Sequence, residues 1–232
     1  MKRLGMIAGM SPESTTHYYE VINKTVCSKL GGNHSAEILM SSVNFQEIVD
    51  LMDRNDWNRI KKTMIKKAIL LEPYVDGIII CTNTIHKIAG DVQKAIDIPL
   101  IHIGKVSAEH VRCRQPDQKV GLLGTSFTMK EDFIKDPFFM AGIDTITPDE
   151  EEMEAIDTII FQELCRGIIL DDSRKKMAHI IDDLQKQGAR GIVLACTELQ
   201  MIVKEQDLQI PVFDTMKIHA EAAAEFVLSN EK

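Results

Sequence analysis

The chain has 232 residues, of which 44% are hydrophobic, enough for one large or two small globular domains. Its formal net charge of −8 and pI near 5.4, with no basic stripe, exclude a nucleic acid or an anionic membrane surface as the expected partner. We therefore expect a small-molecule ligand. The apolar run after Arg3 is too short for a signal peptide, and no stretch could span a bilayer, so we expect a cytoplasmic protein.

The first half of the chain alternates short apolar strands with helices. Residues 4–9 form an apolar strand that runs into a glycine turn, and Ser11 and Pro12 are typical of a helix N-cap and first helical position. The β-branched run over residues 78–80 is typical of a strand that is buried on both faces. The other expected elements are strands over 37–45 and 99–103 and helices over 57–71 and 87–95.

From Val120 the order of signals starts again. Residues 120–126 echo residues 4–11, so that Gly121 follows Gly5 by 116 positions, and Cys196 follows Cys81 by 115. Two matches at nearly the same offset indicate a duplicated α/β unit. The expected elements of this half are strands over 190–194 and 211–214 and helices over 156–169, 174–187 and 219–228. The acidic run 149–154 is interpreted as a solvated first helical turn.

This alternation predicts an α/β fold of two pseudo-symmetric domains with parallel or mixed sheets and the active site in the cleft between them. Ligands of such sheets bind beyond the carboxyl ends of the strands. Four turns are expected at those ends: residues 9–11, 81–83, 124–126 and 196–198.

The five cysteines show no CxxC spacing and no secretory context, so neither a disulfide framework nor a zinc site is expected. Cys27, Cys113 and Cys165 are interpreted as small hydrophobic residues that are buried or half-buried. Cys81 and Cys196 differ from them because each follows an apolar strand and precedes an expected helix, whose N-terminus stabilises a thiolate.

Two thiols at equivalent corners predict a particular chemistry. If one is a thiolate base and the other a thiol acid on the opposite side of a carbon, the proton leaves one face and returns to the other, which inverts the stereocentre. Thr82, Asn83 and Thr197, with the N–H groups of both turns, could hold a substrate carboxylate between them.

The main alternative to this two-thiol chemistry is a Cys–His nucleophile for acyl transfer, because His86 lies five positions after Cys81. That spacing does not by itself place the imidazole at the sulfur, and no local signature of a cysteine protease or amidase is present. We interpret His86 as a helix-face or supporting residue. No glycine-rich phosphate loop or metal-ligand cluster is present, so neither a metal nor a cofactor, pyridoxal phosphate included, is expected.

Several motifs together resemble the aspartate/glutamate racemase family, and the similarity runs from about residue 4 to 228. Members of that family are cofactor-independent amino-acid racemases with two pseudo-symmetric α/β domains. The motifs are Gly9-Met10-Ser11-Pro12-Glu13-Ser14-Thr15 with Tyr18-Tyr19, Ser42-Val43-Asn44-Phe45, Cys81-Thr82-Asn83-Thr84, Gly124-Thr125 with Phe127-Thr128-Met129, and Ala195-Cys196-Thr197-Glu198.

The resemblance implies that Cys81 and Cys196 are the two catalytic acid/bases. It also implies that the C-terminal segment returns to the first domain and pairs residues 211–213 with it, which gives domains 1–100 plus 209–232 and 101–208. A homodimer is implied as well. The substrate-binding residues that it implies are Met10, Ser11, Thr82, Asn83, Thr84, Thr125, Thr197 and Glu198.

Substrate specificity depends on a basic group for the side-chain carboxylate. The helix after residues 43–45 lacks the Arg that some aspartate-specific members place there, and Arg54 is the nearest; Arg166 resembles a second basic position that the family uses. We therefore predict an amino-acid racemase with aspartate or glutamate as leading substrates and a broader range still open. The alternatives are a hydantoin racemase or maleate isomerase, in which one cysteine acts as nucleophile, and a non-catalytic amino-acid-binding module.

Overall fold

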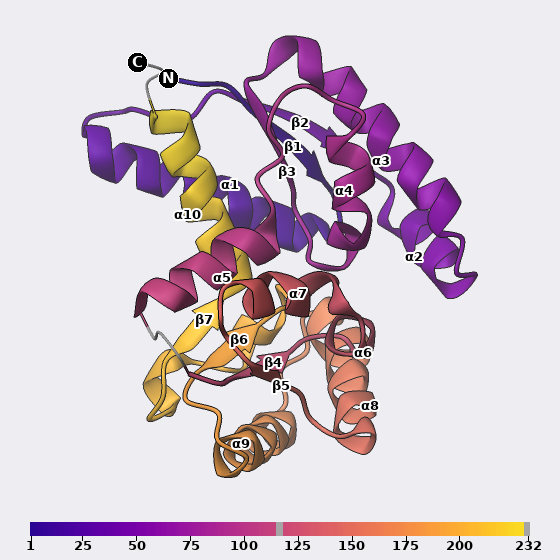
Figure 1. The fold of residues 1–232 in the computed structure, drawn as a ribbon, viewed down its shortest axis with the longest axis vertical. Helices are drawn as coiled ribbons and strands as arrows, with labels where there is room; N and C mark the ends of the chain where they lie inside the picture. The colour runs from indigo at the N-terminus through magenta and orange to yellow at the C-terminus, as the bar shows by residue number, and fades with distance from the viewer. Residues whose placement is uncertain (115–117, 230–232) are drawn as a thin grey trace. The chain divides into compact units, whose positions relative to one another are not determined.

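The computed structural model describes residues 1–114 and 118–229, and the chain divides into two compact units (Figure 1). The first unit comprises residues 1–103 and the chain from His219 onward, and the second comprises residues 104–218. The sequence suggests boundaries near residues 100 and 209, and residues 230–232 of that expected range lie outside the described part. No helix within the described part is long and apolar enough to cross a bilayer.

The first unit is built on a parallel three-stranded sheet with the order β2-β1-β3. Every residue of the outer strand β3 and of the central strand β1 is buried, because helices cover both faces of the sheet. An isolated parallel bridge from Ile78 to Leu100 continues the sheet beyond β3. The strands are β1 (Leu4–Ala8), β2 (Ile38–Ser42) and β3 (Gly77–Ile80).

Helices pack on the two faces of this sheet in distinct groups. On one face Ile7, Ile78 and Ile80 pack with Ile60 and Met64 of α3 in one apolar cluster. Figure 1 shows α1 and α10 on the other side of the sheet from α3 and α4. The helices are α1 (Pro12–Leu30), α2 (Phe45–Asp53), α3 (Trp57–Leu71), α4 (Ala89–Gln93) and α10 (Thr215–Leu228), with short 3-10 helices η1 (Glu72–Tyr74) and η2 (Thr84–Ile88).

The second unit is built on a parallel four-stranded sheet with the order β5-β4-β6-β7. Its core packs Leu123 and Leu194 of the sheet against Met153 of α8 and Ile181 of α9. The strands are β4 (Val120–Leu123), β5 (Thr145–Ile146), β6 (Ile192–Leu194) and β7 (Val212–Asp214). The main helices are α5 (Ile103–Arg114), α6 (Ser126–Lys130), α7 (Asp132–Met140), α8 (Glu150–Thr158) and α9 (Asp171–Lys186).

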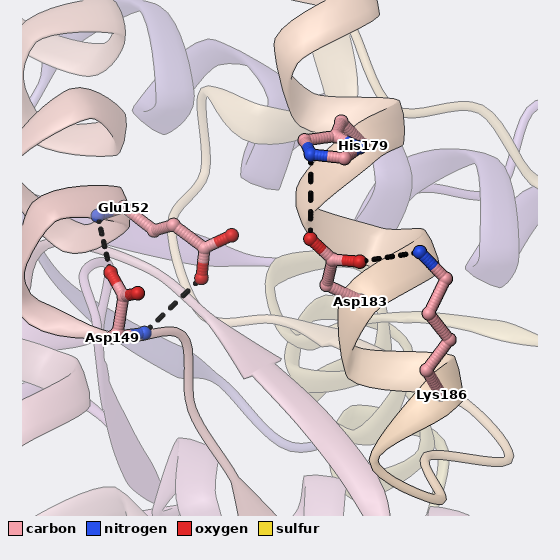
Figure 2. A network of polar contacts seen from close by, with 5 residues as sticks. All are labelled: Asp149, Glu152, His179, Asp183 and Lys186. Carbon is pink, nitrogen blue, oxygen red and sulfur yellow. Dashed lines mark hydrogen bonds and ion pairs between the residues drawn. The ribbon is translucent and has the colours of Figure 1, made fainter.

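The acidic run at 149–154 forms the start of α8, as predicted. Asp149 is the N-cap: its carboxylate accepts a hydrogen bond from the Glu152 N–H at 2.9 Å, and Glu152 accepts one from the Asp149 N–H at 3.2 Å (Figure 2). This reciprocal capping box satisfies two free N–H groups and places negative charge at the positive end of the helix dipole. The run is therefore explained by local helix energetics.

The strand orders confirm the predicted α/β fold with parallel sheets and a repeated unit. The order β2-β1-β3 in the first unit matches β5-β4-β6 in the second. The repeat extends to the next position of each sheet: the Ile78 N–H donates to the Pro99 carbonyl at 2.9 Å, and the Ile192 N–H donates to the Pro211 carbonyl at 2.9 Å. The sequence echo between residues 4–11 and 120–126 therefore reflects a structural repeat.

One predicted pairing is wrong. Residues 211–213 do not join the first domain, because β7 pairs with β6 from Ile192↔Val212 to Leu194↔Asp214 in the second sheet. The chain re-enters the first unit only within α10, at His219. In the second sheet, β7 forms backbone hydrogen bonds with the exposed edge of β6. If residues 211–213 paired with the first sheet instead, that edge of β6 would be left unpaired.

Three further segments differ from the predictions in the type or extent of their secondary structure. The strand expected over 99–103 is reduced to a single bridge at Leu100, because Ile103 already begins α5. The helix expected over 87–95 is the 3-10 helix η2 followed by the short α4. The helix expected over 156–169 changes after Thr158 into the wider π-helix η3 (Ile159–Glu163) and then the 3-10 helix η4 (Leu164–Arg166), which ends at Gly167 in the left-handed conformation.

Candidate active site

The turn after β1 brings backbone and hydroxyl groups to the carboxyl edge of the first sheet. Gly9 has a φ of +90°, and a Cβ there would run into the Ser42 hydroxyl and the Val43 backbone, so only glycine fits. Ser11 is the N-cap of α1: its hydroxyl accepts from the Ser14 N–H at 3.3 Å. Met10, predicted at the same edge, is 4% exposed.

Cys81 directly follows β3 beside this turn. Its N–H donates to the Ile7 carbonyl at 2.9 Å, which continues the hydrogen-bond ladder between β1 and β3. The side chain is fully buried, and burial alone raises the pKa of its thiol far above the ordinary value. The resting form of Cys81 is therefore the neutral thiol.

Thr82, Asn83 and Thr84 form the predicted corner after Cys81. The Thr82 N–H donates to the Ile80 carbonyl at 2.9 Å, and the Asn83 carbonyl accepts from the His86 N–H at 2.9 Å. Asn83 is buried, whereas Thr82 and Thr84 are half-buried. Among residues 81–83, Thr82 is therefore the one that is only half-buried.

Both ring nitrogens of His86 are occupied by the backbone. Nδ1 lies 2.7 Å from the Thr82 carbonyl oxygen, and Nε2 accepts from the Ile103 N–H at 3.2 Å. Because a carbonyl oxygen can only accept, Nδ1 carries the proton and the ring is neutral. Neither nitrogen is left to accept a proton from Cys81, which removes the base that the rival acyl-transfer interpretation needs.

The second corner, after β6, places a thiol beside a carboxylate. The Cys196 thiol donates to the Glu198 carboxylate (Sγ to Oε2, 3.2 Å), and the Thr197 hydroxyl donates to the same oxygen at 2.6 Å. Burial raises the pKa of the Cys196 thiol, and the negative charge of Glu198 raises it further. The arrangement gives Cys196 an acceptor for its proton within hydrogen-bonding distance.

Both corners were expected to precede regular helices, and this expectation is wrong. Cys81 is followed by the 3-10 helix η2 and Cys196 by the three-residue 3-10 helix η5 (Leu199–Met201). Such short elements sum few peptide dipoles, so they offer little of the expected stabilisation of a thiolate. Burial dominates instead, and both thiols have raised pKa values.

Two further residues support the turns of the second unit, and no sequence pattern indicates either of them. The Thr215 hydroxyl donates to the Leu194 carbonyl at 2.8 Å, which fixes the end of β6 just before Cys196. The Asp157 carboxylate accepts from the Ser126 N–H at 2.8 Å in the turn after β4. The predicted site residue Thr125 is the N-cap of α6 in that turn, where its hydroxyl accepts from the Thr128 N–H at 3.3 Å.

The hydrogen-bond register relates the two corners differently from the sequence spacing. Gly5 pairs with Ile78 in the first sheet, and the equivalent Gly121 pairs with Ile192 in the second. Counting onward, Cys81 corresponds to Ala195, and both donate their N–H to equivalent carbonyls, at Ile7 and Leu123. The residue that corresponds to Cys196 is therefore Thr82.

The two predicted arginines are both exposed. Arg166 ends η4 in the second unit, and its neighbour Cys165 makes a minor contribution to the raised pKa of the Cys196 thiol. Arg54 follows α2 in the first unit. Residues 1–114 and 118–229 contain no group of three or more His, Cys, Asp or Glu side chains arranged to hold a metal ion.

Comparison with known proteins places this geometry in a family. A family model described as Asp/Glu/hydantoin racemase matches residues 7–223. A crystal structure of a candidate Asp/Glu racemase from Yersinia pestis is 44% identical, with a TM-score of 0.93 over 99% of this chain and 100% of that chain. An aspartate racemase homologue from Pyrococcus horikoshii OT3 is 32% identical, with a TM-score of 0.87 over 99% and 100% of the two chains.

A relative known by sequence extends over nearly the same length. The broad specificity amino-acid racemase RacX of Bacillus subtilis (strain 168) is 24% identical over 231 residues, which is 97% of this chain and 98% of the relative. The family model covers far more than half of the chain. The chain belongs to the Asp/Glu/hydantoin racemase family.

Proposed function

We propose that this racemase acts on acidic amino acids, with aspartate or glutamate as substrate. We also propose that one side chain removes the α-proton and a second side chain returns a proton to the opposite face, without a cofactor. The observation that carries the proposal is the Cys196 corner, where a thiol, its Glu198 proton acceptor and the Thr197 hydroxyl meet beyond the end of β6. The similarity to an aspartate racemase homologue at 32% identity supports the substrate class.

In the proposed reaction, Cys196 transfers its proton to Glu198, and the thiolate removes the α-proton from one face of the substrate. The C–H bond breaks and its electron pair moves toward the substrate carboxylate. Hydroxyl and N–H donors of the predicted binding residues stabilise that charge. A second group then delivers a proton to the opposite face. Cys196 is a thiol again because it holds the former α-proton, Glu198 releases its extra proton to solvent, and the second group regains a proton from solvent.

The second group belongs to the corner after β3. The sequence spacing favours Cys81, whose thiol is the more acidic group. The strand register favours Thr82, because Thr82 occupies the position equivalent to Cys196 while Cys81 occupies that of Ala195. Thr82 is also half-buried, whereas Cys81 is fully buried. We propose Thr82 as this proton donor and retain Cys81 as the competing candidate, to be distinguished by substitution.

The remaining predicted residues are proposed as substrate contacts. Met10, Ser11, Asn83 and Thr84 lie at the turns of the first unit, and Thr125, Thr197 and Glu198 at those of the second. Arg166 is proposed to bind the side-chain carboxylate, with Arg54 as the alternative. Replacing the correct arginine with Gln should raise KM for aspartate and glutamate but leave KM for a neutral amino acid unchanged.

A chiral chromatography panel tests the function. Single enantiomers of aspartate, glutamate and neutral amino acids are incubated with purified enzyme after exhaustive dialysis and without added cofactor. Racemisation of an acidic amino acid, lost in Cys196→Ser, supports the proposal. Turnover of neutral amino acids alone would favour a range like that named for RacX, and turnover of hydantoins or maleate but no amino acid would favour the rival enzyme classes. Tight amino-acid binding without turnover would indicate a binding module.

We also propose that the protein is a cytoplasmic homodimer, a proposal supported by the family resemblance alone. Light scattering of the purified chain at several concentrations tests the dimer. A mass near that of a single 26.1 kDa chain at all concentrations would contradict it.

A further inference from the structure

His86 joins the proposed proton-donor corner to a distant part of the first unit. Its Nδ1–H donates to the Thr82 carbonyl at 2.7 Å, and its Nε2 accepts from the Ile103 N–H, 17 positions further along the chain. The ring is 2% exposed, so water does not compete for either bond. A buried side chain that bridges two backbone groups in this way fixes their relative position.

The bond to Thr82 acts on the orientation of the proposed donor. The Thr82 N–H is held by the Ile80 carbonyl, and the Thr82 carbonyl is held by His86. With both peptide groups fixed, the Cα–Cβ bond of Thr82 has one direction. Of these two restraints, His86 is the one supplied by a side chain, so it can be altered by substitution.

The surroundings of His86 keep its ring neutral and in one tautomer. The titratable groups that face it are His102, with ring centroids 4.7 Å apart, and His219, at 5.6 Å. His219 is itself bonded on both nitrogens, to the Tyr18 hydroxyl at 2.9 Å and to the Ile101 carbonyl at 2.8 Å. Burial, and then His102 and His219, hold the pKa of His86 well below its ordinary value.

We infer that His86 is a positioning residue for racemisation, which orients Thr82 through the Thr82 carbonyl and anchors that corner to the backbone at Ile103. The inference rests on the proposed function, because positioning matters only if the corner delivers a proton. It predicts that loss of the Thr82 bond lowers kcat more than it raises KM, since misplacement of a reacting group by about 1 Å costs on the order of 100-fold in rate.

Two substitutions separate the two bonds. In His86→Asn the side-chain amide can replace Nδ1–H and keep the bond to Thr82, while the acceptor for Ile103 is lost. In His86→Gln the longer side chain reaches the Nε2 position and can accept from Ile103, while the donor to Thr82 is lost. His219→Gln is the matched control, because His219 packs on the same ring but bonds neither Thr82 nor Ile103.

The measurement is kcat and KM for the best amino-acid substrate, together with hydrogen exchange of peptides that cover 81–85 and 101–105. The expected result is a loss of kcat of about 100-fold in His86→Gln with KM little changed, a much smaller loss in His86→Asn, and near wild-type kcat in His219→Gln. Exchange should rise at 81–85 in His86→Gln and at 101–105 in His86→Asn.

The outcomes distinguish failure of this inference from failure of the proposed function. An active wild-type enzyme with equal kcat in His86→Asn and His86→Gln would overturn the positioning role. If the wild type racemises no amino acid, the proposed function fails. The exchange data then decide the structural part, since unchanged exchange of both peptides in both variants would show that His86 does not hold the corner.

Discussion

The thiol of Cys196 and the carboxylate of Glu198 form a hydrogen-bonded pair, with Sγ 3.2 Å from Oε2. The pair has two opposing effects on the chemistry. The carboxylate raises the pKa of the thiol and so disfavours the thiolate at rest, yet it also lies where it can accept the thiol proton. A neutral substitute at position 198 separates these effects.

Glu198→Gln should lower the pKa of the Cys196 thiol, because it removes the negative charge while keeping the side-chain size. Modification of Cys196 by iodoacetamide should then become several-fold faster at neutral pH, because a lower pKa increases the fraction of the thiol present as thiolate. Peptide mass spectrometry distinguishes Cys196 from Cys113 and Cys165, which are exposed and not buried or half-buried as predicted. Glu205→Gln, an exposed acidic residue of the same unit, is the control. Slower labelling of Cys196 in Glu198→Gln would show that the carboxylate does not raise the pKa of the thiol.

The buried His219 should make the protein less stable in acid. Burial lowers its pKa from 6.5 to about 4 in the folded state, so between these values the unfolded chain binds more protons than the folded one. The contribution of His219 to the free energy of unfolding is therefore at its maximum above pH 6.5. It falls by about 3 kcal/mol as the pH drops toward 4. His86, whose pKa is also lowered, adds to the same trend.

Urea unfolding at pH 7.5 and pH 4.5 checks this sign. His219→Gln cannot take up the proton and should lose less stability between the two pH values than the wild type does. A variant with the same or a steeper loss would show that His219 is not held neutral in the folded chain.

Gly77 provides the space into which the C-terminal helix packs. A Cβ at this position would lie 2.6 Å from Cζ of Phe226 on α10, so Gly77→Ala forces the ring to move. We expect a loss of about 1–3 kcal/mol in the free energy of unfolding. Phe226→Leu should recover part of that loss in the double variant, and strictly additive effects of the two changes would contradict the proposed clash.

The capping box of α8 should contribute measurably to stability. Asp149→Ala removes the acceptor of the Glu152 N–H shown in Figure 2 and should lower the free energy of unfolding by about 1 kcal/mol. Glu151→Gln changes a neighbouring exposed carboxylate that caps nothing and serves as the control. Equal effects of the two changes in thermal unfolding would indicate a general charge effect in place of capping.

Much of the fold follows from local patterns in the sequence. The run Ile78–Ile80 predicts a doubly buried strand because β-branched side chains on both faces need cover, and the structure confirms this. The echo of Gly5 at Gly121 predicts the repeat, since equivalent strands repeat equivalent packing. The partner of β7 could not be predicted in this way, because strand pairing is set by tertiary contacts that leave no local signal.

The candidate site shows the same limit at the level of single residues. Matching the two Cys-Thr pairs in the sequence aligns Cys81 with Cys196, whereas the ladder aligns Thr82 with Cys196. A shift of one position moves a side chain to the other face of a strand, and only the backbone pairing reveals it. The bridge from His86 to Ile103 is equally invisible in the sequence, because its partner is a backbone N–H that any residue could supply.

The central claim is that Cys196 removes the α-proton and Thr82 delivers a proton to the opposite face. Solvent deuterium incorporation tests this claim most directly. A single-enantiomer amino-acid substrate is incubated in D2O with wild type, Cys81→Ala, Thr82→Val or Cys196→Ser, and NMR and chiral chromatography follow the α-proton and the enantiomers. The account predicts that Cys81→Ala keeps most of the racemisation and deuterium uptake, while Thr82→Val and Cys196→Ser each lose at least about 100-fold of the racemisation rate. Full racemisation in Thr82→Val together with its loss in Cys81→Ala would contradict the account and restore the pair of cysteines.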